Sequence, residues 1–523
     1  MIRLVFVLLV ALVIGCSGGG SGSDSGNGVS WTIAVDTSGS GSPLNPALLG
    51  HYDLSGVLYS YPNVSGLAAA MSAVGFAEWR VGAGRWEQAT ELLPNLTDSS
   101  ACPATSGIFS ETAATDEALM AARDWFTYTD GSIVSLGDTA DDGRYDLGYI
   151  RSVIDTAELF DATPFLSIDH MPRALSINQT ANRLDCVTTF MNAVSNNQPQ
   201  DAAVFASAVS GLVQRVVEGT GTRAGDERPR NVSYWEVWNE PELRYFWKPD
   251  WEEYPNLFFD MAVPVLVQLD AYRTSSGHSE LKFGLGSFAF EATAVTVLSA
   301  FDAVPVPMDF ISFHGYDDDP LVLVDKIDAV ASAAQSSTNY TDIEIVLAEW
   351  GPDLETHTSD QAYAAGMEPP LHAATVIALG AAAGLDRTHH ALFYDYHPTL
   401  ALGLVDNNDQ PRTLYRGYEL MAKVIVPGAE RLAPSGLSDG RLDSGMGAVL
   451  VSRDGSGTVR ILLVNRNSSE RSAIVELDGS AATPSTIYAF DGTDDPIDPL
   501  RTVTPTGPKV VMPANSLMVL VFF

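Results

Sequence analysis

The sequence predicts an α/β protein, a (β/α)8 barrel of the TIM type with an accessory antiparallel β-sandwich domain. Three observations lead to this fold class. Short β-branched or aromatic runs alternate with helix-like stretches from about residue 44 to residue 425, as in a parallel sheet covered by helices. Eight such runs occur, which is the number that closes a barrel. After Pro427 short alternating runs follow, separated by Gly, Asn, Asp and Pro, as in a sandwich.

The candidate barrel strands are short, apolar and bounded by turn residues. They are 48–52, 78–81, 163–168, 234–238, 282–286, 309–313, 343–348 and 389–394. Helix-like stretches with apolar residues mostly at helical spacing lie between them, at 66–74, 149–160, 203–219, 255–273 and 373–384. Pro264 lies inside the fourth stretch and should kink or break that helix, because proline lacks a backbone N–H and its ring clashes with the preceding turn.

The chain has 523 residues, more than one hydrophobic core usually organises, so we expect two folded units. Residues 31–36 form a strand-like run that precedes the barrel and otherwise lacks a partner. We therefore expect residues 31–43 to join residues 427–523 in the sandwich, and residues 44–425 to form the barrel.

The N-terminus predicts export. Residues 1–15 contain Arg3 and then an apolar run that is too short to span a bilayer, as in a signal peptide. The sequence VIGC resembles the lipobox of bacterial lipoproteins, which implies lipidation of Cys16; an ordinary secretory signal is the alternative. Residues 16–30 form a Gly/Ser-rich tether. We expect a protein lipid-anchored to the bacterial cell envelope, at the outer membrane or cell surface, that contacts the membrane through this anchor alone.

The charge balance limits the partners. The formal net charge is -36, with 65 acidic residues against 29 lysines and arginines, which disfavours nucleic acid and polyanionic substrates. No cysteine and histidine spacing predicts a metal site, and we expect no cofactor. Cys102 and Cys186 could pair or remain free thiols. The acidic loop 138–146 faintly suggests calcium, but it lacks the glutamate of an EF-hand, and a solvated turn is the plainer interpretation.

Two glutamates stand at the carboxyl ends of predicted barrel strands. Glu240 follows one strand in NVSYWEVWNEPE, and Glu349 ends another in IEIVLAEWGPD. Active sites of (β/α)8 barrels are built at this edge. A single strand-end glutamate is more often solvated or salt-bridged. Two together can hydrolyse a glycosidic bond, because one can protonate the leaving oxygen while the other attacks the anomeric carbon or directs water at it.

Other polar residues at strand ends could support this pair. A nucleophilic Glu349 must stay ionised, which nearby donors and cations favour. Arg80 ends the second strand, Tyr316 follows the sixth, and His314 stands beside Tyr316. Asn239 could hydrogen-bond a sugar hydroxyl. Tryptophans that could offer flat faces to pyranose rings, with core packing as the alternative for each, are Trp86, Trp247, Trp251 and Trp350.

Several segments carry a family resemblance: PFLSIDHMPRAL at 164–175, WEVWNEPEL, DFISFHGY, LAEWG and LGLVD at 402–406. They resemble clan A glycoside hydrolases, and most of all glycoside hydrolase family 39, which includes β-xylosidases and α-L-iduronidases. The similarity spans about residues 45–523 and implies a retaining enzyme whose barrel carries a C-terminal β-sandwich. It implies that Glu240 is the acid/base and Glu349 the nucleophile. Residues implied to support or bind the sugar are Arg80, Asn239, His314 and Tyr316.

The sequence also departs from the family pattern. Arg80 is followed by Val-Gly-Ala-Gly, where the family usually has an Arg-aromatic-His-Gly segment. A histidine contact to substrate is therefore missing, or another residue such as His51 or His170 supplies it. The last strand reads HHALFYDYHP in place of a Trp-containing segment, which makes Tyr394 a further substrate-binding candidate.

Two alternatives remain open at this point. One is a carbohydrate-binding surface lipoprotein without turnover, although binding alone requires neither an acid nor a nucleophile. The other is an endo-β-glycanase of a different clan A family. The sequence leaves open the sugar, its anomeric configuration, exo or endo action and the oligomeric state.

Overall fold

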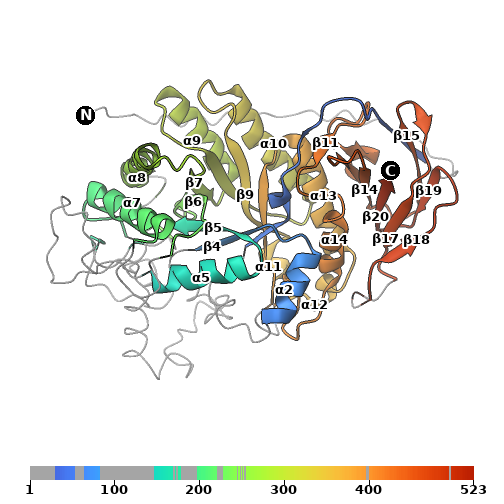
Figure 1. Cartoon of the computed structure of the whole chain (residues 1–523), viewed down its shortest axis with the longest axis horizontal. Coiled ribbons are helices and arrows are strands. Elements are labelled where there is room, and N and C mark those ends of the chain that lie inside the picture. Colours follow the sequence, from blue (N-terminus) through green and yellow to red (C-terminus); the bar gives the residue numbers. More distant parts are fainter. Residues whose placement is uncertain are drawn as a thin grey trace.

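The structure, a computed structural model, describes residues 30–52, 64–82, 147–168, 197–220, 228–243 and 255–523, without 396–399, 494–495 and 497 but with 171, 175–177, 246, 247, 249 and 251. A barrel with its surrounding helices lies beside a pair of β-sheets, and helices α13 and α14 lie between them (Figure 1). None of the helices in the described part of the chain is long and apolar enough to cross a membrane.

Eight parallel strands close into a barrel in the order β10-β3-β4-β5-β6-β7-β8-β9. Their bounds are β3 Gly50–Tyr52, β4 Glu78–Gly82, β5 Thr163–Ile168, β6 Tyr234–Val237, β7 Lys282–Phe288, β8 Phe310–Tyr316, β9 Glu344–Gly351 and β10 Arg387–Ala391. The predicted barrel is confirmed, and each predicted strand overlaps an observed one. Because consecutive strands pair in parallel, their carboxyl ends all lie at one rim.

The barrel is covered by helices that return the chain to the opposite rim. They are α2 Val64–Ala73, α5 Gly148–Leu159, α7 Ala202–Glu218, α8 Pro255–Ser276, α9 Glu291–Ala303, α10 Pro320–Ser336, α13 Glu368–Ala383 and α14 Thr413–Met421, with short α11 Leu354–His357 and α12 Gln361–Ala364. Pro264 does not break α8, which runs on through it. The buried face of α8, with Met261, Val265 and Leu266, packs against α7, and such packing can outweigh one missing hydrogen bond.

Two further sheets follow the barrel. A four-stranded sheet contains β1 Ser30–Val35, β15 Arg471–Leu477, β16 Ser480–Ala481 and β19 Lys509–Met512. An eight-stranded sheet contains β2 Ser42–Pro43, β11 Glu430–Leu432, β12 Arg441–Leu442, β13 Gly447–Arg453, β14 Val459–Asn465, β17 Thr486–Phe490, β18 Arg501–Val503 and β20 Ser516–Phe522. Strand β1 pairs in parallel with β15, whereas the other pairs in these sheets are antiparallel.

The eight-stranded sheet is buried on both faces. One face packs against the four-stranded sheet through residues such as Ile461 and Leu520, which share a core with Ile33 and Val475. The other face packs against the barrel helices α13 and α14. Every residue of β20 is accordingly buried.

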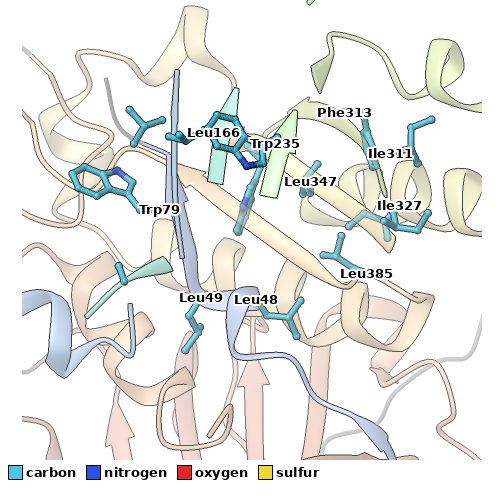
Figure 2. Packing of buried hydrophobic residues seen from close by; sticks show 14 of the residues in the cluster. Leu48, Leu49, Trp79, Leu166, Trp235, Ile311, Phe313, Ile327, Leu347 and Leu385 are labelled. Atoms are coloured by element: carbon cyan, nitrogen blue, oxygen red, sulfur yellow. The ribbon is translucent and has the colours of Figure 1, made fainter. Parts of the chain in front are cut away.

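The barrel strands alternate in the direction of their side chains, and this positions the polar residues. Trp79, Leu166, Trp235 and Leu347 lie in the main hydrophobic core, with helix residues such as Ile327 (Figure 2). Successive side chains of a strand point to opposite faces, so the neighbours of these residues point into the barrel. Inward residues near the carboxyl rim include Arg80, Glu236 and Ser312, all buried.

Candidate active site

The predicted carboxylates come together at the carboxyl rim of the barrel, on either side of one imidazole ring. His314 Nδ1 lies 2.8 Å from Glu240 Oε1, and His314 Nε2 lies 3.8 Å from Glu349 Oε2. The strands explain this arrangement, because His314 of β8 is paired in register with Glu349 of β9. Glu240 reaches the ring from the turn after β6.

Two residues with positive φ place the Glu240 side chain in a largely buried position. The φ of Glu240 is 39° and that of Trp238 is 75°, so the chain leaves β6 through two left-handed residues that are not glycine. The Glu240 N–H donates to the carbonyl oxygen of Ser287, 2.9 Å away. Burial raises the pKa of the Glu240 carboxyl to about 7, and Arg80 offsets this only in part. Glu240 can therefore keep a proton near neutral pH.

Glu349 has different surroundings. The Tyr316 hydroxyl donates a short hydrogen bond to Glu349 Oε1, and Arg80 Nη1 lies 3.7 Å from Glu349 Oε2. Burial, followed by the Glu349 carboxylate, holds the pKa of Tyr316 well above its usual range, so the phenol remains a donor. A donor and a cation on the same carboxylate favour its ionised form.

A buried ion pair positions Arg80 beneath the two glutamates. Arg80 donates to Glu236 Oε2 from Nε at 3.0 Å and from Nη2 at 2.7 Å, and Nη2 also donates to Asn239 Oδ1 at 2.9 Å. Ser312 Oγ donates to Glu236 Oε1 at 2.5 Å. Burial alone would raise the pKa of Glu236, but Arg80 and Ser312 outweigh that effect, so the pKa is lowered and Glu236 stays a carboxylate.

His314 is neutral in this environment. It is 2% exposed, and burial lowers its pKa to about 4 even though Glu349 acts in the opposite direction. A neutral imidazole has one donor and one acceptor nitrogen. Its second nitrogen, Nε2, lies 3.0 Å from Ser287 Oγ.

The structure thus brings together Arg80, Asn239, Glu240, His314, Tyr316 and Glu349. Trp350 lies elsewhere, fully buried in the main core, with its ring 4.9 Å from that of His390. Because neighbouring residues of a strand point to opposite faces, Trp350 must face the helices if Glu349 faces the site. It is a core residue, and the prediction that it offers a face to sugar needs this correction.

Other predicted substrate contacts are also buried. Tyr394 is 8% exposed, and its hydroxyl donates to the carbonyl oxygen of Asn407 at 3.3 Å. Trp247 is fully buried, and Trp251 packs partly buried against Phe258 and Phe288. His51 is fully buried and stacked on Phe76. These side chains act in packing, as long strand-end aromatics commonly do.

Several predictions fall on residues outside the described part of the chain. They concern His170, Trp86, Cys16, Cys102, Cys186 and the acidic loop 138–146. Among the described residues no group of three or more His, Cys, Asp or Glu could hold a metal ion.

Sequence reasoning missed three residues of the site. Glu236 lies within an aromatic run that predicts a strand, and its inward position follows from alternation with Trp235 and Val237. The inward position of Ser312 in β8 follows in the same way from alternation with Ile311 and Phe313. Ser287 has none, because its position depends on a local irregularity of β7.

Comparisons with known proteins identify the family to which the chain is similar. The family described as Glycosyl hydrolases family 39 matches residues 132–417, more than half of the chain, including both glutamates. A β-xylosidase of Caldicellulosiruptor saccharolyticus is 27% identical over 182 residues, which cover 34% of this chain and 33% of that protein. The matched segment therefore spans about a third of that relative's length.

Solved structures match over nearly the whole chain. A GH39 enzyme from Xanthomonas axonopodis pv. citri has a TM-score of 0.61 and 15% identity, covering 95% of this chain and 98% of that one. A monomeric β-xylosidase from Caulobacter crescentus CB15 has a TM-score of 0.62 and 14% identity, covering 94% and 99%. At such identities these structures show the fold, which includes the sheets beside the barrel. The family match over residues 132–417 goes further, and by it the chain belongs to glycosyl hydrolases family 39.

Proposed function

We propose that this protein is a retaining glycoside hydrolase in which Glu240 is the acid/base and Glu349 the nucleophile. The observation that carries the proposal is the contrast between two carboxyls on one imidazole ring. Glu240 is desolvated and beside a neutral histidine, which favours its protonated form. Glu349 accepts from Tyr316 and lies near Arg80, which favours its ionised form.

The two glutamates act in sequence. In the first step Glu240 gives its proton to the glycosidic oxygen while Glu349 attacks the anomeric carbon, so the leaving group departs as an alcohol and a glycosyl ester forms on Glu349. In the second step the Glu240 carboxylate takes a proton from water. That water attacks the anomeric carbon, breaks the ester and restores both residues. This chemistry requires carboxyls about 5–5.5 Å apart.

The proposed substrate is a β-linked xylo-oligosaccharide or a related neutral sugar. Two of the similar proteins are named β-xylosidases, which supports this class. The formal charge of -36 disfavours uronates, since anionic substrates must approach an anionic protein.

We also propose that the chain is exported and anchored by a lipid on Cys16, which rests on its N-terminal sequence. In a bacterial host, Cys16→Ser should move the protein from the membrane fraction to the soluble fraction. An unchanged membrane fraction would contradict the anchor.

A panel of aryl and alkyl β-xylosides tests the acid/base assignment. In Glu240→Gln, kcat/KM should fall roughly 10²–10⁴-fold on alkyl xylosides and xylobiose, whose leaving groups need a proton. On 2,4-dinitrophenyl xyloside the loss should be only a few-fold, because this leaving group departs as an anion.

The controls separate the competing explanations. An equal loss on all members of the panel would count against Glu240 as the acid. If the wild-type protein bound xylo-oligosaccharides but cleaved no member, it would be a binding protein. Products of mixed length from a xylan chain would indicate an endo-acting enzyme.

A further inference from the structure

Strand β7 ends in a bulge that aims Ser287 into the active site. The pairing of β7 with β8 shifts its register between Leu285 and Phe288. Gly286 has a φ of 135°, and a Cβ built on it would lie 2.5 Å from the Ser312 carbonyl oxygen. Ser287 itself has a φ of 48°. Bulges and left-handed residues other than glycine are found preferentially at functional sites.

Ser287 connects four parts of the site through its own atoms. Its N–H donates to Ser312 Oγ at 2.7 Å, and its carbonyl oxygen accepts from the Glu240 N–H at 2.9 Å. Its Oγ accepts from Arg80 Nη2 at 2.5 Å and lies 3.0 Å from His314 Nε2. The side chain is fully buried. One small residue therefore contacts the backbone of one catalytic glutamate and the histidine between both.

The donors and acceptors around Ser287 Oγ fix the direction of its proton. Arginine can only donate, so the Arg80 contact uses an acceptor site of Ser287. Ser287 keeps its hydrogen and a second acceptor site, and a buried hydroxyl hydrogen needs an acceptor. Among the described contacts of Ser287 Oγ, only His314 Nε2 can accept that hydrogen. If Nε2 accepts, the single hydrogen of the neutral imidazole is on Nδ1. Nδ1 then donates to Glu240 Oε1, 2.8 Å away, and the acid proton of Glu240 is left on Oε2.

We propose that Ser287 is a positioning residue that sets the tautomer of His314 and thereby keeps the acid proton of Glu240 on the oxygen available to the leaving group. The proposal rests on the assignment of Glu240 as acid/base. In the opposite tautomer His314 Nδ1 would accept, and it would bind the Glu240 proton that the leaving group needs. Ser287 therefore acts through His314 and touches no reacting atom.

Two variants of Ser287 test the role of its hydroxyl. Ser287→Ala removes the hydroxyl and keeps the Cβ, whereas Ser287→Gly removes both and also relieves the left-handed backbone. Both should lose roughly tenfold or more in kcat/KM on xylobiose and only a few-fold on 2,4-dinitrophenyl xyloside, as partial loss of general acid catalysis predicts. Similar losses in the two variants would assign the effect to the hydroxyl. Normal activity of Ser287→Gly beside a defective Ser287→Ala would assign it to the backbone and overturn the proposal.

Ser312→Ala is the matched control, because Ser312 belongs to the same network and has no contact with His314 among the described hydrogen bonds. It should lower activity by the same factor on both substrates. The dependence on leaving group should appear in the Ser287 variants alone. A Ser287→Ala variant that loses the same factor on both substrates would contradict the proposal.

The tautomer of His314 can also be measured directly, in the wild-type protein and in Ser287→Ala. In ¹⁵N-labelled histidine spectra, His314 should carry its hydrogen on Nδ1 at neutral pH, and Ser287→Ala should shift the hydrogen towards Nε2. A hydrogen on Nε2 in the wild type would overturn the proposal. If Glu240→Gln shows the dependence on leaving group and the Ser287 variants do not, only the role of Ser287 is wrong. If Glu240→Gln lacks it, the assignment of the acid is wrong.

Discussion

The barrel contains a buried arginine and glutamate network at each end, and the two networks differ in how completely their charges are paired. At the amino rim, Arg387 donates to Glu78 Oε1 at 2.5 Å and to Glu344 Oε2 at 2.7 Å, and its guanidinium also donates to the Tyr234 hydroxyl. His389 Nε2 lies 3.0 Å from Glu78 Oε2. Each of these carboxylates has a close partner, which is the arrangement expected of a network that stabilises the fold.

At the carboxyl rim, Arg80 has more acidic neighbours than it can neutralise. Among the carboxylates, Arg80 makes short contacts with Glu236 alone in the described part of the chain; Glu349 lies 3.7 Å away, and Glu240 has a neutral histidine as its close partner. Phe165, Phe310 and Val346 form an apolar layer along the inner face between the two ends. The comparison indicates that the same residue types form a paired network at one rim, whereas at the other rim Glu240 is left without a close cationic partner among the described residues, as expected of a carboxyl with a shifted pKa at a functional site.

Removing the proposed nucleophile should produce the largest effect. Glu349→Gln should lower kcat at least about 10⁴-fold on every glycoside of the panel, because no glycosyl ester can form. The free energy of unfolding should change little, since Glu349 is at the poorly paired end. Peptide mapping after treatment with a 2-deoxy-2-fluoro-xyloside checks the assignment, and a label on any residue other than Glu349 would contradict it.

Breaking the amino-rim network should have the opposite signature. Arg387→Met should lower the free energy of unfolding by about 3–5 kcal/mol, because it leaves the buried Glu78 carboxylate and the partly exposed Glu344 carboxylate without their cation. The kcat of the folded fraction should stay within about threefold, since the apolar layer separates this network from the site. Urea unfolding and active-site titration measure the two quantities. A large fall in kcat at unchanged stability would show that the two ends are coupled.

The smallest effect should be a gain in stability on removing the Glu240 charge. The pKa of Glu240 is raised to about 7 in the folded protein from an ordinary value of 4.5. Between pH 4.5 and 7 the folded state therefore binds more protons than the unfolded state. The contribution of this carboxyl to the free energy of unfolding is full below pH 4.5 and is lost as pH rises through 7. Glu240→Gln, which carries no charge, should thus be about 1–3 kcal/mol more stable than wild type at pH 8.

At pH 4 that difference should vanish, because Glu240 is protonated in both states. Urea unfolding at the two pH values measures it. Equal free energies of unfolding for wild type and Glu240→Gln at pH 8 would show that burial does not destabilise the Glu240 carboxylate in the folded protein. Glu349→Gln serves as the comparison, since its carboxylate has donors around it.

The sequence predicted the parts that depend on strand ends. Eight apolar runs located the barrel, and a glutamate at the end of two of them located the carboxylates, since parallel strands bring their carboxyl ends to one rim. Trp350 was misplaced because an aromatic residue beside a catalytic one suggests sugar stacking. Glu349 and Trp350 are neighbours on β9, so once Glu349 is assigned to the site, Trp350 must face the helices. Alternation counted from Leu347 would have given the reverse, because the pairing of β8 with β9 shifts its register beside Glu349.

Other parts of the site were beyond the sequence. Ser287 is brought to His314 by a bulge in β7, and the letters Gly-Ser-Phe do not distinguish a bulge from an ordinary strand end. The charges on Glu240 and Glu349 depend on which donors surround each carboxyl, and these donors come from strands far apart in the chain. The inward position of Glu236 follows from strand alternation, but the surrounding aromatic run is also typical of a strand that is buried on both faces, so the run alone does not single this residue out.

The burial of α13 and α14 under the eight-stranded sheet bears on how this enzyme could be shortened or recombined. From Pro369 to Gly380 every residue of α13 is buried, whereas a helix on the outside of a free-standing barrel would present a polar stripe to water. A barrel cut off near residue 425 would expose that apolar surface and would be prone to aggregate. Grafting this catalytic unit onto another protein therefore means transplanting its flanking sheets as well.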